Sequence, residues 1–100
     1  MIRHIVLWRL KDEAEGTDKA TNAARIAVAL KSLVGTIDGL ISLEVGADAV
    51  GLPGAWDLAL LADFEDEEAL KRYQVHPKHV EVGKFISSVR LDRAVVDYRV

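Results

Sequence analysis

Four segments of the chain alternate apolar and polar residues with the two-residue period of a β-strand. They cover residues 2–10, 40–46, 55–64 and 93–100. In the first segment the even-numbered side is largely apolar, and Ile5 and Leu7 make the middle of the odd-numbered side apolar as well. A strand with water on one side does not need that, so the pattern predicts a sheet with both faces covered.

Helical periodicity occupies the two long stretches between these strands. The first helix is expected to begin at Thr17 or Asp18, which can cap it, and to run to about Val34. Its predicted apolar stripe is Ala20, Ala23, Ala27, Leu30 and Val34.

The second helical stretch is expected to begin after Asp66, with Leu70 and Tyr73 facing inward. Pro77 ends that helix and suits the first turn of another one. The inward residues of this last helix are predicted to be Val82, Phe85, Ile86 and Val89.

The resulting order, β-α-β-β-α-β with a bend at Pro77, predicts a single α+β domain over residues 1–100. Right-handed crossovers arrange two split β-α-β units in an antiparallel sheet with the strand order fourth, first, third, second. The helices then cover one face, and the apolar opposite face needs a second sheet. We therefore expect a homodimer; the alternative is a monomer with a poorly covered sheet.

Composition narrows the range of partners. The formal net charge is −3, which argues against nucleic acid or an anionic membrane as the main partner. Cysteine is absent, which excludes disulfides, thiolate nucleophiles and cysteine metal sites. The first residues lack the pattern of a signal peptide, and no stretch approaches the ~20 apolar residues of a membrane span. A cytoplasmic location is the default expectation.

The densest polar constellation lies around Pro77, where Tyr73 to His79 reads Tyr-Gln-Val-His-Pro-Lys-His. A histidine titrates near neutrality, and a tyrosine can donate a hydrogen bond to a developing oxyanion. Tyr73 and His79 stand on either side of the helix break and could converge on one pocket. The alternative is structural: His76 caps the following helix, and His79 lies on the solvent-exposed side of that helix.

A second pair comes from the two ends of the chain. The first and last strands are expected to be antiparallel neighbours, which brings His4 near Asp97. A carboxylate beside an imidazole fixes its tautomer and could orient a catalytic base. The two residues could also form a purely structural cross-strand pair. The histidines lack the usual spacing of zinc ligands, and no phosphate-binding loop or nucleophile elbow is present, so we expect no cofactor.

Together these segments resemble the stress-responsive A/B barrel (Dabb) family over nearly the whole chain. The resemblance is carried by residues 4–11, 43–48, 57–64, 67–73, 76–79 and 95–98. The Tyr-x-x-His-Pro-x-His segment is the most specific part. The resemblance implies a ferredoxin-like fold and a dimeric α/β barrel made of two back-to-back sheets.

The resemblance also implies site residues. A plant polyketide cyclase of this family has a proposed catalytic pair that corresponds to Tyr73 and His79, and His4 and Asp97 match two of its other positions. Its pocket implies ligand contacts at His76, Leu58 and Trp8, with Leu58 standing where the cyclase has a histidine. Some plant members bind magnesium on backbone carbonyls, and the matching residues here are Val34, Ile37 and Leu40.

Three functions remain open from the sequence. The first is a homodimer that binds a small apolar or carbonyl-containing molecule near Tyr73 and His79 without chemistry. The second is a lyase or cyclase in which His79 is the base and Tyr73 the acid or oxyanion donor. The third, a cofactor-independent monooxygenase, rests on analogy of fold.

Overall fold

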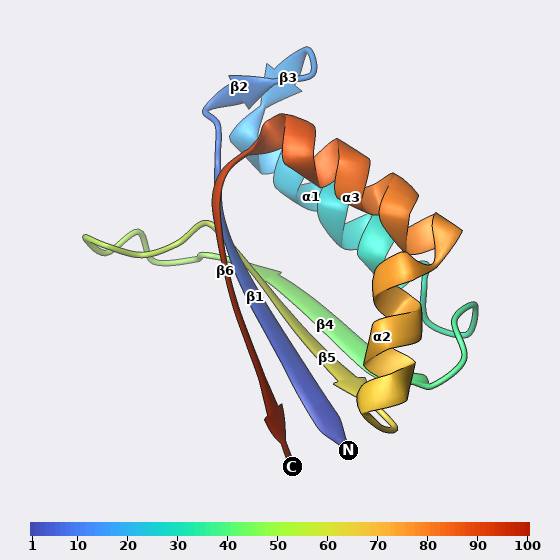
Figure 1. Cartoon of the computed structure of the whole chain (residues 1–100). Helices are drawn as coiled ribbons and strands as arrows, with labels where there is room; N and C mark the ends of the chain where they lie inside the picture. Colours follow the sequence, from blue (N-terminus) through green and yellow to red (C-terminus); the bar gives the residue numbers. More distant parts are fainter.

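The computed structural model describes all of residues 1–100 and shows a four-stranded sheet with three helices on one side (Figure 1). The elements are β1 (Ile2–Leu10), β2 (Glu13–Ala14), β3 (Thr17–Asp18), α1 (Lys19–Lys31), β4 (Leu40–Ala47), β5 (Leu58–Phe64), α2 (Glu67–Val75), α3 (Pro77–Val89) and β6 (Arg90–Arg99). None of the helices has the length and apolar character that crossing a membrane requires.

The main sheet has the strand order β4-β5-β1-β6, and every neighbouring pair is antiparallel. This confirms the strand order expected from two right-handed split β-α-β units. Strand β1 is central, and its register sets Val6 opposite Leu60 of β5 and Val95 of β6. Both ends of the chain therefore lie close together at the same end of the sheet (Figure 1).

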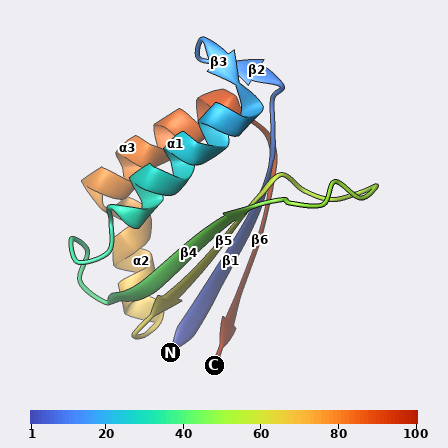
Figure 2. The ribbon, with the colours of Figure 1, turned by 180° about the vertical axis from the view of Figure 1, so that it is seen from behind.

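Alternation along β1 and β5 builds the core beneath the helices. Every second residue of each strand is buried, from Ile2 to Leu10 and from Leu58 to Phe64. All three helices pack on that face, as the front and back views show (Figure 2). Burial of these side chains is the main stabilising term of the fold, at roughly 1.5–3 kcal/mol for each large apolar side chain.

Helix α1 differs from its prediction in length and in phase. It ends at Lys31, and its buried face is centred on Asn22, Ile26 and Leu30, whereas Val34 is exposed. The predicted stripe followed alanines, which are tolerated on either face of a helix. Ile26, which is fully buried, fixes the true orientation.

A capped break separates α2 from α3. The Asp66 carboxylate accepts the Ala69 amide at 2.8 Å and starts α2. His76 is extended, with φ −64° and ψ 132°, as expected before a proline, and its Nδ1 accepts the Lys78 amide at 3.1 Å. Pro77 then opens α3. The change of direction lets residues of the last turn of α2 and the first turn of α3 face one space.

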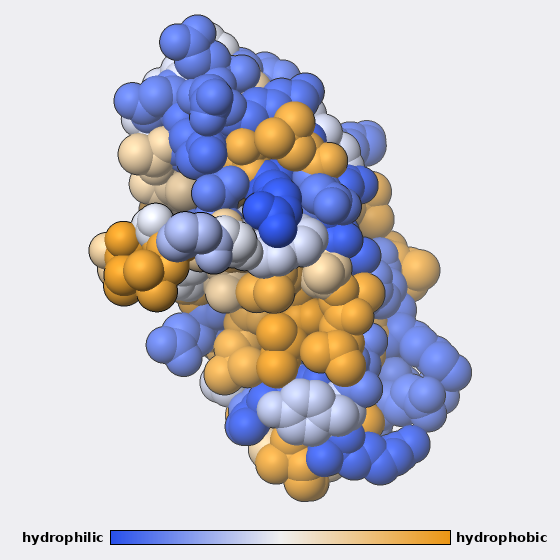
Figure 3. Space-filling model, turned by 90° about the vertical axis from the view of Figure 1, so that its left-hand side faces the viewer, coloured by the Kyte–Doolittle hydropathy of each residue, from blue (hydrophilic) through white to orange (hydrophobic).

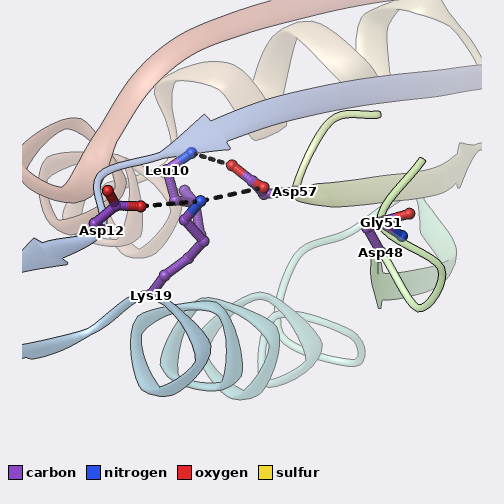
Figure 4. A network of polar contacts seen from close by, with 6 residues as sticks. All are labelled: Leu10, Asp12, Lys19, Asp48, Gly51 and Asp57. Carbon is purple, nitrogen blue, oxygen red and sulfur yellow. Dashed lines mark hydrogen bonds and ion pairs between the residues drawn. The ribbon is translucent and has the colours of Figure 1, made fainter. Parts of the chain in front are cut away.

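The end of the sheet opposite this break is held by a carboxylate (Figure 4). Asp57 accepts the Leu10 amide at 2.8 Å, and the Lys19 ammonium bridges Asp57 at 3.5 Å and Asp12 at 3.4 Å. The segment after β1 contains the small β2–β3 hairpin, whose turn residues Glu15 and Gly16 have positive φ. Lys19 thus ties this hairpin to the start of β5.

Candidate functional site

A cavity of about 300 Å³ opens between the sheet and the last helix. Strand β1 provides three alternate residues, and α3 provides residues spaced by one and two turns, so each element presents one face to the cavity. The lining residues are His4, Val6, Trp8, Leu30, Leu60, Tyr73, Gln74, His79, Gly83, Ile86, Ser87, Arg90 and Arg93. The wall is apolar at its base and carries polar groups from α2, α3 and β6.

Tyr73 and His79 meet across the helix break. Their ring centroids are 3.9 Å apart with an angle of 38° between the planes. Tyr73 is completely buried and also packs on Phe64, at a centroid distance of 4.9 Å. The structure therefore brings the two residues together at one cavity and places His79 partly inside rather than on the solvent side of α3.

Three buried polar atoms around this cavity have no hydrogen-bond partner: Trp8 Nε1, Tyr73 Oη and His79 Nδ1. Asn22 Oδ1, the fourth such atom in the chain, lies on α1 and does not line the cavity. Native proteins pair nearly all buried polar groups, because each unpaired one costs about 1–3 kcal/mol. Three of the four such atoms in the chain belong to residues that line this one cavity.

The protonation states follow from burial. Removal from water raises the pKa of the Tyr73 phenol well above its usual value, although nearby Arg93 opposes the shift. Burial also lowers the pKa of His79 below its usual value; the Gln74 backbone opposes this shift, and the positive charge of Arg93 adds to it. At neutral pH the cavity thus holds a tyrosine that keeps its proton and a neutral imidazole.

The side chains of His4 and Asp97 contact each other across the neighbouring strands β1 and β6. They are direct partners in the β1–β6 register, and His4 Nδ1 lies 2.5 Å from Asp97 Oδ1. The carboxylate accepts this hydrogen bond, so Nδ1 carries a proton, and Nε2 is the ring nitrogen that Asp97 leaves unengaged. The His4 ring also lies edge-on to Tyr73 at a centroid distance of 6.2 Å. His4 therefore lines the same cavity, and Asp97 holds its ring.

Of the three predicted ligand contacts, only Trp8 lines this cavity. His76 is the cap of α3 and faces a separate hollow beside Arg72 and Asp38. Leu58 is buried next to Trp8 in the strand register and borders a hollow near the β4–β5 loop. The structure does not bring His76 and Leu58 to this cavity, because the cavity lies over β1 and β6, and β5 reaches it only through Leu60; their ligand contacts stay predictions.

The backbone carbonyls expected to hold magnesium lie after α1. The Ile37 carbonyl accepts the Leu40 amide at 3.3 Å, so one of its lone pairs is engaged in the turn. Arg72 and Asp38 line the same hollow as Ile37, so a positive and a negative charge offset one another there. The magnesium site on these carbonyls stays a prediction, and no step proposed below uses a metal ion.

The sequence reasoning missed Gly83, Arg90 and Arg93. Arg93 lies four residues before Asp97 on the same face of β6, so strand parity alone could have placed it at the site. Gly83 lies within the continuous helix α3 and does not have a positive φ. A Cβ placed on it would meet no atom within 4 Å. The sequence alone does not show that a glycine within a helix lines a cavity; this is recognised only when the structure shows the space beside it.

Comparisons with known proteins agree with this picture. The family described as the stress responsive A/B barrel domain matches residues 2–100. An uncharacterized protein of Streptomyces coelicolor is 38% identical over 79 residues, which is 79% of each chain. A dimeric ferredoxin-like protein of unknown function from Thermobifida fusca is 31% identical, with a TM-score of 0.85 over 99% of this chain and 90% of that one.

A hydroxynitrile lyase from Passiflora edulis has a TM-score of 0.79, with 97% of this chain and 90% of that chain covered. At 17% identity this likeness shows the fold alone. The ferredoxin-like α+β fold predicted from the sequence is confirmed by the relatives that share it.

Proposed function

Because this chain belongs to the stress responsive A/B barrel (Dabb) family, we propose that it binds a small organic molecule in the cavity between β1 and α3. The observation that carries the proposal is the gathering of Trp8 Nε1, Tyr73 Oη and His79 Nδ1, unpaired and buried, around one space. A ligand oxygen that accepts from the indole or phenol would remove a cost of about 1–3 kcal/mol per group, which then contributes to affinity.

The lining defines the chemistry of this ligand. Val6, Leu30, Leu60 and Ile86 contact an apolar body, while the phenol and indole donate hydrogen bonds to a carbonyl or hydroxyl oxygen. The volume of about 300 Å³ corresponds to about ten water-sized volumes of about 30 Å³ each. A compact molecule of roughly that many heavy atoms, with one ring or a short chain, fits the cavity.

A ligand screen by thermal shift tests this function, repeated on three variants of the full chain. Gly83→Leu fills the cavity without meeting protein atoms at Cβ, and Tyr73→Phe and His79→Ala remove polar groups. Ala24→Leu, on the exposed side of α1, is the matched control. Ligands that raise the melting temperature of the wild type and of Ala24→Leu, and not of Gly83→Leu, support the site. Ligands that stabilise all of these proteins alike contradict it.

The His4–Asp97 pair favours a second candidate function, proton transfer at an enolisable carbonyl compound. A neutral imidazole, His79 as the sequence predicts or His4 held by Asp97, would take the proton from the carbon next to the carbonyl. The electron pair moves onto the carbonyl oxygen, and the Tyr73 hydroxyl donates a hydrogen bond to the enolate oxygen that forms. Return of the proton to another atom completes a lyase- or cyclase-type step.

The helix-free side of the sheet supports a homodimer. Ile5 and Leu7 of β1, Leu61 of β5, and Ala94 and Val96 of β6 form its centre. Val96 is 54% exposed, and the space-filling view shows a continuous apolar patch on this side (Figure 3). The loop between β4 and β5 projects from the same side (Figures 1 and 2) and exposes Val50 and Leu52. Two such faces packed about 10 Å apart would cover both patches.

A further inference from the structure

Two guanidinium groups line the cavity without a partner. Arg90 and Arg93 come from the beginning of β6, and neither forms an ion pair with a carboxylate of this chain. No aspartate or glutamate lines the cavity, and the nearby Asp97 is engaged with His4. The chain as a whole carries a formal charge of −3, so the charge of the cavity lining is opposite in sign to the net charge of the protein.

The positive potential reaches the buried groups as well. Arg93 lowers the pKa of both Tyr73 and His79, which places its charge within range of the cavity base. Half-buried Arg90 caps the C-terminal end of α3, and exposed Arg93 lies at the mouth, opposite Trp8 in the β1–β6 register. The guanidinium fork matches the two oxygens of a carboxylate and pairs with them at about twice the strength of a neutral hydrogen bond.

From this arrangement, which rests on the proposed function, we infer that the ligand is an organic carboxylate. Its charged group would lie against Arg93 and Arg90 at the mouth, and its apolar body would extend toward Val6 and Leu60. A phosphate could use the same arginines, but the C-terminal turn of α3 faces this cavity through Ile86 and Ser87. The partial negative charge of a helix C-terminus disfavours a doubly charged group more than a singly charged one.

Benzoate, benzamide and phenyl phosphate separate these possibilities, because they share one ring and differ in charge. We expect calorimetric titration of the wild-type protein to show benzoate binding about tenfold more tightly than benzamide at low salt. Arg93→Met and Arg90→Met should each reduce that preference, and Arg25→Met, an exposed arginine of α1 outside the cavity, should leave it unchanged.

The outcomes distinguish this inference from the function on which it rests. Equal binding of benzoate and benzamide, lost in both cases in Gly83→Leu, overturns the carboxylate and leaves the small-molecule site standing. A preference that survives both arginine substitutions overturns the inference in the same way. Tighter binding of phenyl phosphate than of benzoate assigns a phosphate instead. Binding of none of the three counts against the inference and the site together.

Discussion

The ring centroids of Tyr73 and His79 lie 3.9 Å apart across the break between α2 and α3, where His76 alone separates the two helices. Pro77 makes this possible, because it ends the amide ladder of α2 and starts α3 in a new direction. In a continuous helix the two side chains, six residues apart, would point about 120° away from each other around the axis. The site is therefore a product of the break.

Replacing Tyr73 by Phe tests whether its hydroxyl is reserved for a ligand. The hydroxyl is buried without a partner, so Tyr73→Phe should leave the free energy of unfolding unchanged or raise it by about 1 kcal/mol. Denaturant titration of the ligand-free protein measures this. A loss of more than about 1 kcal/mol would show that the hydroxyl already has a partner in the folded chain.

The pKa of His79 makes stability depend on pH. Burial lowers its folded-state pKa below the usual value of 6.5, so the unfolded chain takes up the proton first as the pH falls. Above about pH 6.5 the imidazole is neutral in both the folded and the unfolded chain, and the free energy of unfolding does not depend on it. The free energy of unfolding should fall as the pH drops from there toward the folded-state pKa. His79→Gln should flatten this part of the curve of unfolding free energy against pH. An unchanged slope in that variant would contradict the assignment.

Replacing Gly83 tests whether the space beside α3 is open. A Cβ at this position meets no neighbour, and alanine is the better helix former by about 0.5–1 kcal/mol. Gly83→Ala should therefore raise the free energy of unfolding by about that amount, with only slight loss of ligand affinity. A destabilised Gly83→Ala protein would mean that the space at α3 is not open.

Proton transfer is checked by isotope exchange. If the second candidate function holds, the protein should accelerate the exchange of α-protons of a small ketone such as acetophenone in deuterated water. NMR measures the rate, which Tyr73→Phe and His4→Gln should each lower by about 10²-fold. Exchange no faster than in buffer removes this candidate and leaves binding unaffected.

The apolar, helix-free side of the sheet predicts a dimer, and a single charged substitution on that side should dissociate it. Leu7 lies in the middle of that face, and Leu7→Glu would bury an unpaired carboxylate between the two sheets. Sedimentation should show a dimer for the wild type and for Ala24→Glu, whose substitution lies on an exposed side of α1, and a folded monomer for Leu7→Glu. A monomeric wild type at high protein concentration would contradict the dimer.

Sequence patterns predicted the sheet because alternation and crossover handedness leave few arrangements for four strands. The same topology placed His4 beside Asp97, and the proline rule placed the turn that joins Tyr73 to His79. The orientation of the helices could not be predicted in the same way. Alanines misplaced the phase of α1, and without the packing of α3 over β1 neither Gly83 nor Arg90 could be assigned to the cavity. The monooxygenase alternative stays a prediction from fold.

The central claim is that a ligand oxygen pairs with the polar atoms of the cavity, and the two tryptophans report on it directly. Trp8 lines the cavity and its buried indole N–H has no partner, whereas Trp56 lies before β5 with the Arg9 guanidinium 4.3 Å from its ring centroid. In ¹⁵N-resolved spectra, titration with benzoate or acetophenone should shift the Trp8 indole signal and leave the Trp56 signal in place. Saturating ligand that moves neither signal, or both equally, would contradict binding in this cavity.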